Sequence, residues 1–179
     1  MSEFYTMKIA GLERNLKLFP VSDTLEIAAF ILFGDTEITV ASATELLKKT
    51  PEFDYILTPE AKSIPLAYEM SRQSGKPYIV ARKGTKVYMG HPVEVSVTSI
   101  TTQREQHLYL GEDEVELVKG KRVLIVDDVI STGESLLAVR ELLEKSGGIE
   151  AGACAVLAEG DAADRDDIIF LEKLPLFFK

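Results

Sequence analysis

Cysteine, histidine and long apolar runs are scarce in this chain of 179 residues. A single cysteine, Cys154, excludes an intramolecular disulfide, and its place in the apolar run 153–157 predicts a core residue rather than a nucleophile. The two histidines, His91 and His107, form no HExxH pattern, and the sequence shows no other cluster of metal-ligand type. The longest apolar stretch, residues 27–33, is far shorter than the roughly 20 residues that a membrane span needs. With no apolar signal segment in residues 1–10, these absences predict a soluble cytoplasmic protein.

Positive charge is also in deficit. The chain has 20 Lys and Arg against 29 Asp and Glu, a net charge of −9. Nucleic acids and anionic membranes need a positive protein face, so we expect neither as the main partner. A local basic pocket for a small anion stays compatible with this balance. The length and the 46% apolar composition are those of one globular domain, expected over residues 1–179.

Short apolar runs alternate along the chain with segments whose apolar residues recur at helical spacing. This alternation predicts βαβ units, and therefore an α/β fold with a central, mainly parallel sheet flanked by helices. The expected helices are 42–51, opened by a Ser-x-x-Glu capping box, then 61–74 and 134–146. Strand-like runs are expected at 36–40, 53–58, 77–82, 123–126 and 149–157.

The segments outside this alternation have their own expected places. Residues 1–33 are expected to form a small hood over a core of residues 34–160, with the tail 161–179 packed back on that core. Residues 84–110 lack a helix signal and have a polar tip at 101–106, which predicts a long flexible hairpin or loop acting as a lid. A rigid hairpin in the sheet or at a dimer interface is the alternative.

The most informative segment is residues 123–135, VLIVDDVISTGES. A buried strand ends in two carboxylates, and a loop of Ser, Thr and Gly leads into a helix. Ligands of open α/β sheets bind beyond the carboxyl ends of the strands, where loop amides and a helix N-terminus attract phosphate. The hydroxyls are further donors, and Gly133 lets the backbone approach an anion closely.

Asp127 and Asp128 would repel a bare phosphate. They suit a ligand that also offers sugar hydroxyls or a bridging Mg²⁺, so the segment predicts a sugar phosphate whose sugar lies over the two carboxylates. The competing interpretation, in which these residues only cap a helix and solvate a loop, explains single residues better than the whole pattern.

The same thirteen residues resemble the phosphoribosyl pyrophosphate (PRPP) motif of type I phosphoribosyltransferases. Residues 58–63, TPEAKS, are similar to the Glu-Ala-Arg-Gly loop of the adenine enzymes, with Lys62 in place of arginine. Residues 80–84, VARKG, resemble the segment that opens their mobile catalytic loop. The resemblance covers about residues 20–160 and implies the type I phosphoribosyltransferase fold.

The resemblance also implies a role for each matching residue. Asp127 and Asp128 would hold the ribose hydroxyls and, indirectly through PRPP and water, Mg²⁺ as the cofactor. The residues implied to hold the 5′-phosphate are Ser131, Thr132, Gly133, Glu134 and Ser135. Those implied to bind or neutralise pyrophosphate are Ala61, Lys62, Ser63, Arg82, Lys83 and Lys86. Solvated surface charge is the alternative for the cations, above all for Lys83 and Lys86.

The implied activity is transfer of phosphoribose from PRPP to a purine base, in a homodimer. Enzymes for 6-oxopurines carry a lysine just after the strand that follows the PRPP helix, whereas residues 156–161, VLAEGD, contain none. A carboxylate or carbonyl there suits the exocyclic amine of adenine, so adenine is favoured over hypoxanthine, guanine and xanthine. The Leu-Glu-Tyr-Gly of the adenine enzymes is absent from the expected lid, and no proton-transfer residue is assigned. A PRPP-binding regulator without catalysis is the second class of function, although the segment before the core leaves no room for a helix-turn-helix domain.

Overall fold

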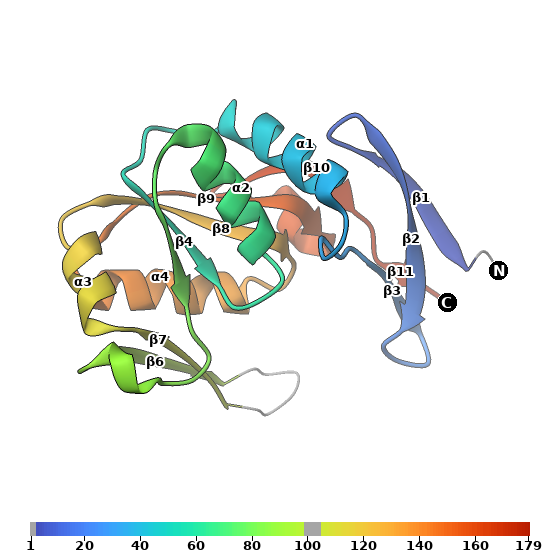
Figure 1. The fold of residues 1–179 in the computed structure, drawn as a ribbon. Helices are drawn as coiled ribbons and strands as arrows, with labels where there is room; N and C mark the ends of the chain where they lie inside the picture. Colours follow the sequence, from blue (N-terminus) through green and yellow to red (C-terminus); the bar gives the residue numbers. More distant parts are fainter. Residues whose placement is uncertain (1–2, 99–104) are drawn as a thin grey trace.

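A five-stranded parallel sheet forms the centre of the protein (Figure 1). The computed structural model describes residues 3–98 and 105–179, so part of the expected hairpin tip lies outside the described residues. The strands follow the order β10-β9-β8-β4-β5, and every neighbouring pair is parallel. Their bounds are β4 Tyr55–Pro59, β5 Tyr78–Ala81, β8 Arg122–Ile130, β9 Ile149–Glu159 and β10 Ile169–Leu174. The predicted α/β fold with a parallel sheet is confirmed.

Helices cover both faces of this sheet. The helix α2 (Ile64–Ser74) joins β4 to β5 and packs beside α1 (Thr36–Leu47) on one face, while α4 (Glu134–Lys145) joins β8 to β9 on the other (Figure 1). Each face has its own buried apolar cluster, one around α4 and one beneath α1 and α2. Cys154 is fully buried as predicted, and burial raises the pKa of its thiol to about 12. Among the described residues, no helix is both long and apolar enough to cross a membrane.

The strand order places a crevice between β4 and β8. From β4 the chain moves outward to β5, and from β8 it moves outward in the other direction to β9 and β10. The loops that leave β4 and β8 therefore part toward opposite faces of the sheet, which is the topological switch point where α/β proteins bind ligands. Both loops belong to the segments 58–63 and 123–135, which were predicted to bind the ligand.

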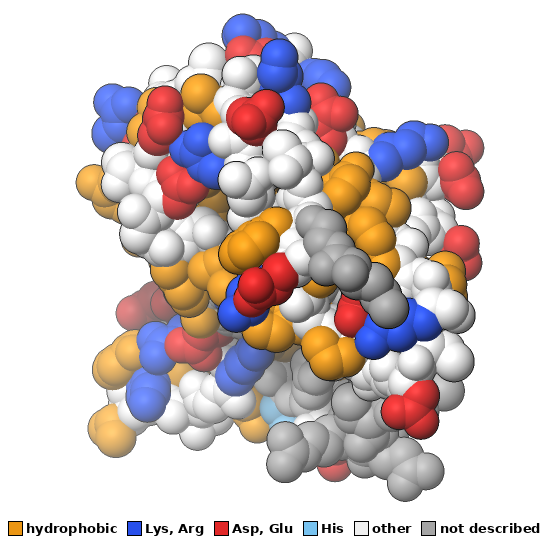
Figure 2. Space-filling view, turned by 90° about the vertical axis from the view of Figure 1, so that its right-hand side faces the viewer, with side chains coloured by type: hydrophobic (Ala, Val, Ile, Leu, Met, Phe, Trp, Pro, Cys, Tyr) orange, Lys and Arg blue, Asp and Glu red, His pale blue; other side chains and the backbone are white. Residues whose placement is uncertain are grey.

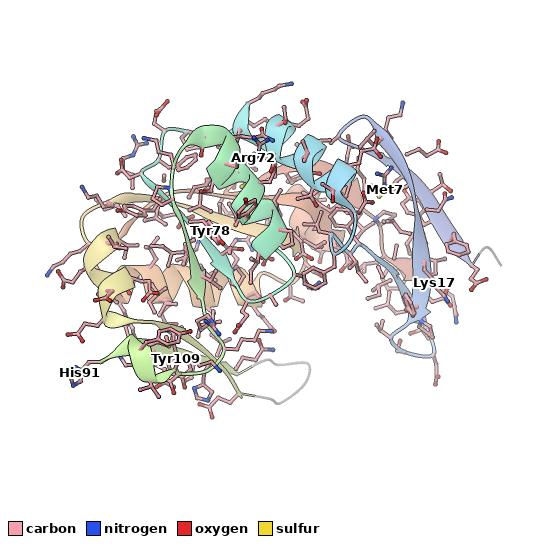
Figure 3. The ribbon with its side chains drawn as sticks, in the orientation of Figure 1. Met7, Lys17, Arg72, Tyr78, His91 and Tyr109 are labelled. Atoms are coloured by element: carbon pink, nitrogen blue, oxygen red, sulfur yellow. The ribbon has the colours of Figure 1, made fainter. Side chains whose placement is uncertain are left out.

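The N-terminal hood is a separate antiparallel sheet. Its strands β1 (Phe4–Ile9), β2 (Leu12–Pro20) and β3 (Leu25–Ala29) are joined by β11 (Phe177–Phe178) from the other end of the chain. The tail therefore does more than pack on the core, because β10 extends the main sheet and β11 extends the hood. Met7 and Lys17 mark the hood in Figure 3, at the opposite end of the molecule from His91 and Tyr109. Acidic and basic side chains are interspersed on the hood side in Figure 2.

Some local expectations were wrong. Residues 36–40 are the first turns of α1 and no strand, because the Asp35 carboxylate caps the helix by accepting a hydrogen bond from the Ile38 amide at 3.1 Å. Ser42 consequently lies inside the helix and is buried. The helix α3 (Glu112–Val118) and the 3₁₀ turns η1 (Val87–Met89) and η2 (Gly160–Asp164) were not predicted.

The segment expected as hairpin or loop contains a hairpin of β6 (Val93–Thr98) and β7 (Glu105–Leu110). It packs against α4, and Val95, Leu108 and Leu110 belong to the core cluster on that face. Arg82, just after β5, exchanges two backbone hydrogen bonds with Tyr109 of β7, at 2.9 and 2.8 Å. The hairpin is thus fastened to the edge of the main sheet, while residues 99–104 lie outside the described part.

Candidate active site

The loops after β4 and β8 enclose a cavity of about 430 Å³ at the switch point. A smaller hollow of about 100 Å³ lies inside the loop between β8 and α4. Of the residues singled out from the sequence, the larger cavity brings together Ala61, Lys62, Ser63, Lys83, Asp127, Asp128, Thr132, Glu134 and Ser135. The smaller hollow is lined by Asp127, Ser131, Thr132, Gly133 and Ser135 among them.

The two carboxylates form an acidic pair at the end of β8. Asp128 is 3% exposed and Asp127 is half-buried, and the Asp128 amide donates to Asp127 Oδ1 at 2.9 Å. Removal from water, followed by the negative charge of Asp128, raises the pKa of Asp127 to about 8. Lys62 Nζ lies 3.2 Å from Asp128 Oδ2, yet this buried oxygen accepts no hydrogen bond within the described chain. The pair therefore holds acceptor capacity that the protein itself leaves unused.

This donor set fits Mg²⁺ bound jointly with a substrate. Carboxylate oxygens are the ligands that Mg²⁺ prefers, and the ion commonly takes its other ligands from water and phosphate. No cluster of three or more His, Cys, Asp or Glu side chains suited to a metal occurs in residues 3–98 and 105–179. Asp127 and Asp128 could thus hold the ion only with oxygens supplied by ligand and water, as the indirect role predicted from the sequence requires.

The loop between β8 and α4 has the form of an anion site. Gly133, at φ +83°, is the N-cap of the 12-residue helix α4, and no side chain caps that helix. A left-handed backbone of this kind favours glycine, and first-turn amides beyond Glu134 that no side chain caps can point at an anion. Thr132 Oγ1 accepts a 3.4 Å contact from the Glu134 amide. The carboxylate of Glu134 itself stands at the first turn and lines the larger cavity.

Glu60 anchors the opposite loop, residues 60–63. Its carboxylate accepts hydrogen bonds from the Lys83 amide at 2.8 Å and from Arg82 Nε at 3.0 Å. These two groups hold the pKa of Glu60 below its usual range, with the amide as the larger cause. The Glu60–Ala61 peptide bond is cis. The loop is therefore joined to the end of β5, and the exposed Lys83 lies at the cavity wall.

The side-chain hydroxyl of Ser63 is hydrogen-bonded inside the core, although the residue lines the cavity. Ser63 Oγ and Thr58 Oγ1 share a hydrogen bond of 2.7 Å, and Thr58 Oγ1 also donates to the Val126 carbonyl at 2.8 Å. These buried bonds connect the end of β4, the loop 60–63 and the end of β8 just before the acidic pair. They fix the distance between the two walls of the cavity.

Arg82 and Lys86 do not line the cavity. The Arg82 guanidinium binds Glu60 and also donates to the Tyr88 hydroxyl at 3.0 Å, which turns it to another side of the molecule. Lys86 is exposed in the turn before η1. In this arrangement Arg82 is bound to its neighbours and Lys86 is exposed, and their expected role in neutralising pyrophosphate stays a prediction.

Other lining residues were missed from the sequence. The hairpin contributes Val97, Gln106 and Leu108 to the cavity wall, and Glu60 organises the loop 60–63. Glu60 stands inside the quoted motif 58–63, so its presence there was the available signal. No sequence signal pointed to the hairpin residues, because their contribution to the cavity depends on how the hairpin packs on α4.

Comparisons with known proteins agree with this geometry. The family model described as a phosphoribosyl transferase domain matches residues 35–175. A hypoxanthine/guanine phosphoribosyltransferase of Methanococcus voltae is 35% identical over 153 residues, covering 86% of this chain and 75% of its own length. One from Methanocella paludicola is 32% identical over 160 residues, covering 87% and 78%.

Among solved structures, the adenine phosphoribosyltransferase of Thermoanaerobacter pseudethanolicus superposes with a TM-score of 0.71 at 22% identity, covering 88% of this chain and 95% of its own. At that identity the likeness concerns the fold. Together with the family model and the two relatives, it shows that this chain is a phosphoribosyltransferase enzyme and belongs to the type I phosphoribosyltransferase family.

Proposed function

We propose that this enzyme transfers the phosphoribosyl group of PRPP to a purine base, forming a nucleoside 5′-monophosphate and releasing pyrophosphate. The observation that carries the proposal is the buried acidic pair with unused acceptor capacity, set between a phosphate loop and a loop bearing Lys62. A ligand with a phosphate at one end, hydroxyls in the middle and a second anionic group at the other end matches this order of groups.

In the proposed reaction the bond between C1 of ribose and pyrophosphate breaks, and a ring nitrogen of the base bonds to C1 and loses its proton to water or to the departing pyrophosphate. Pyrophosphate leaves with the bonding electrons, so negative charge grows on it while positive charge grows on the ribose. Asp127 and Asp128 accept hydrogen bonds from the ribose hydroxyls, and the loop 131–135 holds the 5′-phosphate. Lys62 and Lys83 line the same cavity and stabilise the departing charge. When bound at the acidic pair, Mg²⁺ supplies further positive charge for the leaving group.

We propose adenine as the acceptor base. Residues 156–161, at the end of β9 and the start of η2, offer Glu159 and backbone carbonyls as acceptors and contain no lysine. The next lysine along the chain, Lys173, lies in β10 with its ammonium 3.8 Å from Asp164. An acceptor-rich segment of this kind, without a lysine, suits an exocyclic amine, which donates hydrogen bonds.

A second candidate substrate is hypoxanthine or guanine. The relatives named above are called hypoxanthine/guanine phosphoribosyltransferases, and their identity of 32–35% exceeds that of the adenine enzyme. Their names favour this candidate, whereas the missing lysine favours adenine.

The deciding experiment incubates the purified protein with PRPP and Mg²⁺ and one base at a time: adenine, hypoxanthine, guanine, xanthine, orotate or uracil. We expect monophosphate and pyrophosphate in equal amounts with adenine. If only hypoxanthine or guanine gives product, the acceptor base is the second candidate and not adenine. Binding of PRPP without turnover of any base would replace catalysis by a PRPP-binding regulatory function.

We also propose that the enzyme is a homodimer, as the resemblance implies. Sedimentation equilibrium tests this, with twice the chain mass of 19.8 kDa as the expected result. A particle of single chain mass at micromolar concentration would contradict it.

A further inference from the structure

Arg165 from the C-terminal part of the chain touches the phosphate loop. It is the C-cap residue of η2, and its Nη1 occupies the space that a Cβ on Gly133 would need. Gly133 is the left-handed residue at which this loop turns into α4. A positive side chain thus lies directly against the backbone of the turn that the phosphate of the substrate would use.

The guanidinium is held in this position from its far side. Asp167 accepts hydrogen bonds from Arg165 Nε at 2.8 Å and from Nη2 at 2.7 Å. Asp167 is itself fixed by Arg140 Nη1 at 2.8 Å, and Arg140 also binds Glu150. Two of the three guanidinium nitrogens are therefore used by Asp167. The third, Nη1, faces Gly133 and donates no hydrogen bond to any of the described residues.

The contact places a positive charge beside a loop that carries a negative one. Phosphate sites at helix N-termini work through positive potential, yet this loop carries the carboxylate of Glu134 at its first helical residue. Arg165 contributes an opposite charge next to Gly133 and does not line either cavity. Its charge therefore approaches the loop from outside both hollows, and its side chain fills the space beside the turn.

We propose that Arg165 is a positioning residue for the 5′-phosphate: it supports the turn at Gly133 and supplies positive potential behind the phosphate loop. This inference rests on the proposed use of the loop 131–135 for phosphate. It assigns Arg165, which lies outside the motif 123–135, to the recognition of the phosphoribosyl end of the substrate.

The test uses ribose 5-phosphate and inorganic pyrophosphate as separate calorimetric probes on the full chain. We expect Arg165→Gln to weaken ribose 5-phosphate about tenfold, because one positive charge near a doubly charged phosphate is lost. Pyrophosphate affinity should change less than about twofold, since that anion is assigned to the other loop. In turnover, the KM for PRPP should rise while kcat changes little, and Arg165→Lys should restore much of the lost affinity.

Arg140→Gln is the matched control. It removes an arginine from the same Asp167 network without touching Gly133, so it should lower Tm but leave ribose 5-phosphate affinity within about twofold of the wild type. Unchanged affinity in Arg165→Gln, or an equal loss in Arg140→Gln, would overturn the inference. Failure of the wild-type protein to bind ribose 5-phosphate would overturn it together with the phosphate loop. Wild-type binding without turnover of any base would refute the proposed reaction alone.

Discussion

Two adjacent carboxylates, one of them almost fully buried, are costly for a fold and useful for a ligand. Asp127 and Asp128 lie at the end of a buried strand, where mutual repulsion and loss of water both oppose ionisation. The nearby Lys62 ammonium compensates them only in part, since its side chain is 59% exposed. A site of this kind gains free energy when hydroxyl donors or a cation arrive.

The raised pKa of Asp127 predicts a pH-dependent gain in stability for Asp127→Asn. The unfolded chain loses this proton near pH 3.9, whereas the folded protein keeps it until about pH 8. Between these values the unfolded state binds fewer protons, so the stability of the wild type falls as pH rises through the window. Asparagine does not titrate, so the Tm advantage of the variant should grow from pH 5 to pH 8.

Differential scanning calorimetry of both proteins at pH 5, 6, 7 and 8 measures this effect. A gain of about 1 kcal/mol corresponds to roughly 2–4 °C in a chain of this size. If Asp127→Asn raises Tm by the same amount at every pH, ionisation of Asp127 does not cause the increase.

Lys62 is expected to serve the substrate more than the fold. Its partner Asp128 is buried, but the Lys62 side chain is 59% exposed and its ammonium keeps contact with water, so we expect the ion pair to contribute only about 1 kcal/mol. Lys62→Ala should therefore shift Tm by no more than a few degrees while lowering kcat/KM for PRPP about tenfold or more, as expected for a lost charge-assisted hydrogen bond.

Lys48→Ala, which removes an exposed lysine paired with Glu45 on α1, is the control and should leave the kinetics unchanged. A large fall in Tm with normal kinetics in Lys62→Ala would assign Lys62 a structural role instead.

At the scale of elements, the site depends on how β4 and β8 are joined at their ends. The hydrogen bonds of Thr58 with Ser63 and with the Val126 carbonyl are buried and connect one wall of the cavity to the other. The resulting geometry belongs to neither strand alone.

Thr58→Val tests this connection, because it keeps the shape and removes the hydroxyl. Leaving buried partners unsatisfied costs about 1–3 kcal/mol, so Tm should fall by several degrees and the KM for PRPP should rise. Thr44→Val on α1 removes a hydroxyl bonded to Val40 and Gln73 at a partly buried position and should change far less. Equal effects in the two variants would show that the buried position of Thr58 does not matter.

At the scale of the whole molecule, ion pairs add to the apolar packing that joins the hood to the core. Arg14 of β2 binds the carboxylates of Asp35 at 2.8 Å and Glu37 at 3.0 Å, at the start of α1. Asp35 caps α1 at the same time, and the Arg14 hydrogen bond is the main cause that lowers the Asp35 pKa. One arginine therefore connects the hood to the first helix of the core.

Arg14→Met should loosen this junction. Hydrogen bonds to charged groups contribute about 1.5–3 kcal/mol, so we expect a Tm several degrees lower, with a difference from wild type that shrinks at high salt. Lys145→Met removes a lysine that pairs with the exposed Glu141 inside α4 and serves as the control with a smaller effect. A salt-independent difference would point to lost packing of the Arg14 side chain and not to its charge.

Much of the site could be predicted because it is local in the sequence. The segment 123–135 contains the end of a strand, a loop and the start of a helix, so its amides, hydroxyls and carboxylates meet without any help from distant residues. The helices and strands around it were readable for the same reason, since apolar spacing of two or about 3.6 residues reports one buried face. Residues 36–40 show the limit of such reasoning: their β-branched side chains favour a strand, but the Asp35 cap and packing on α2 make them helical.

The sequence by itself therefore determined the α/β class, the acidic pair with the loop of Ser, Thr and Gly that follows it, and the family. Only the tertiary structure decided what these groups meet: Lys62 at Asp128, Arg82 turned to Glu60 and Tyr88, Arg165 against Gly133, and a hood built from both ends of the chain. These contacts join residues that are far apart in sequence. They follow from the order of strands in the sheet and from the packing of loops on it, and neither leaves a periodic pattern in the chain.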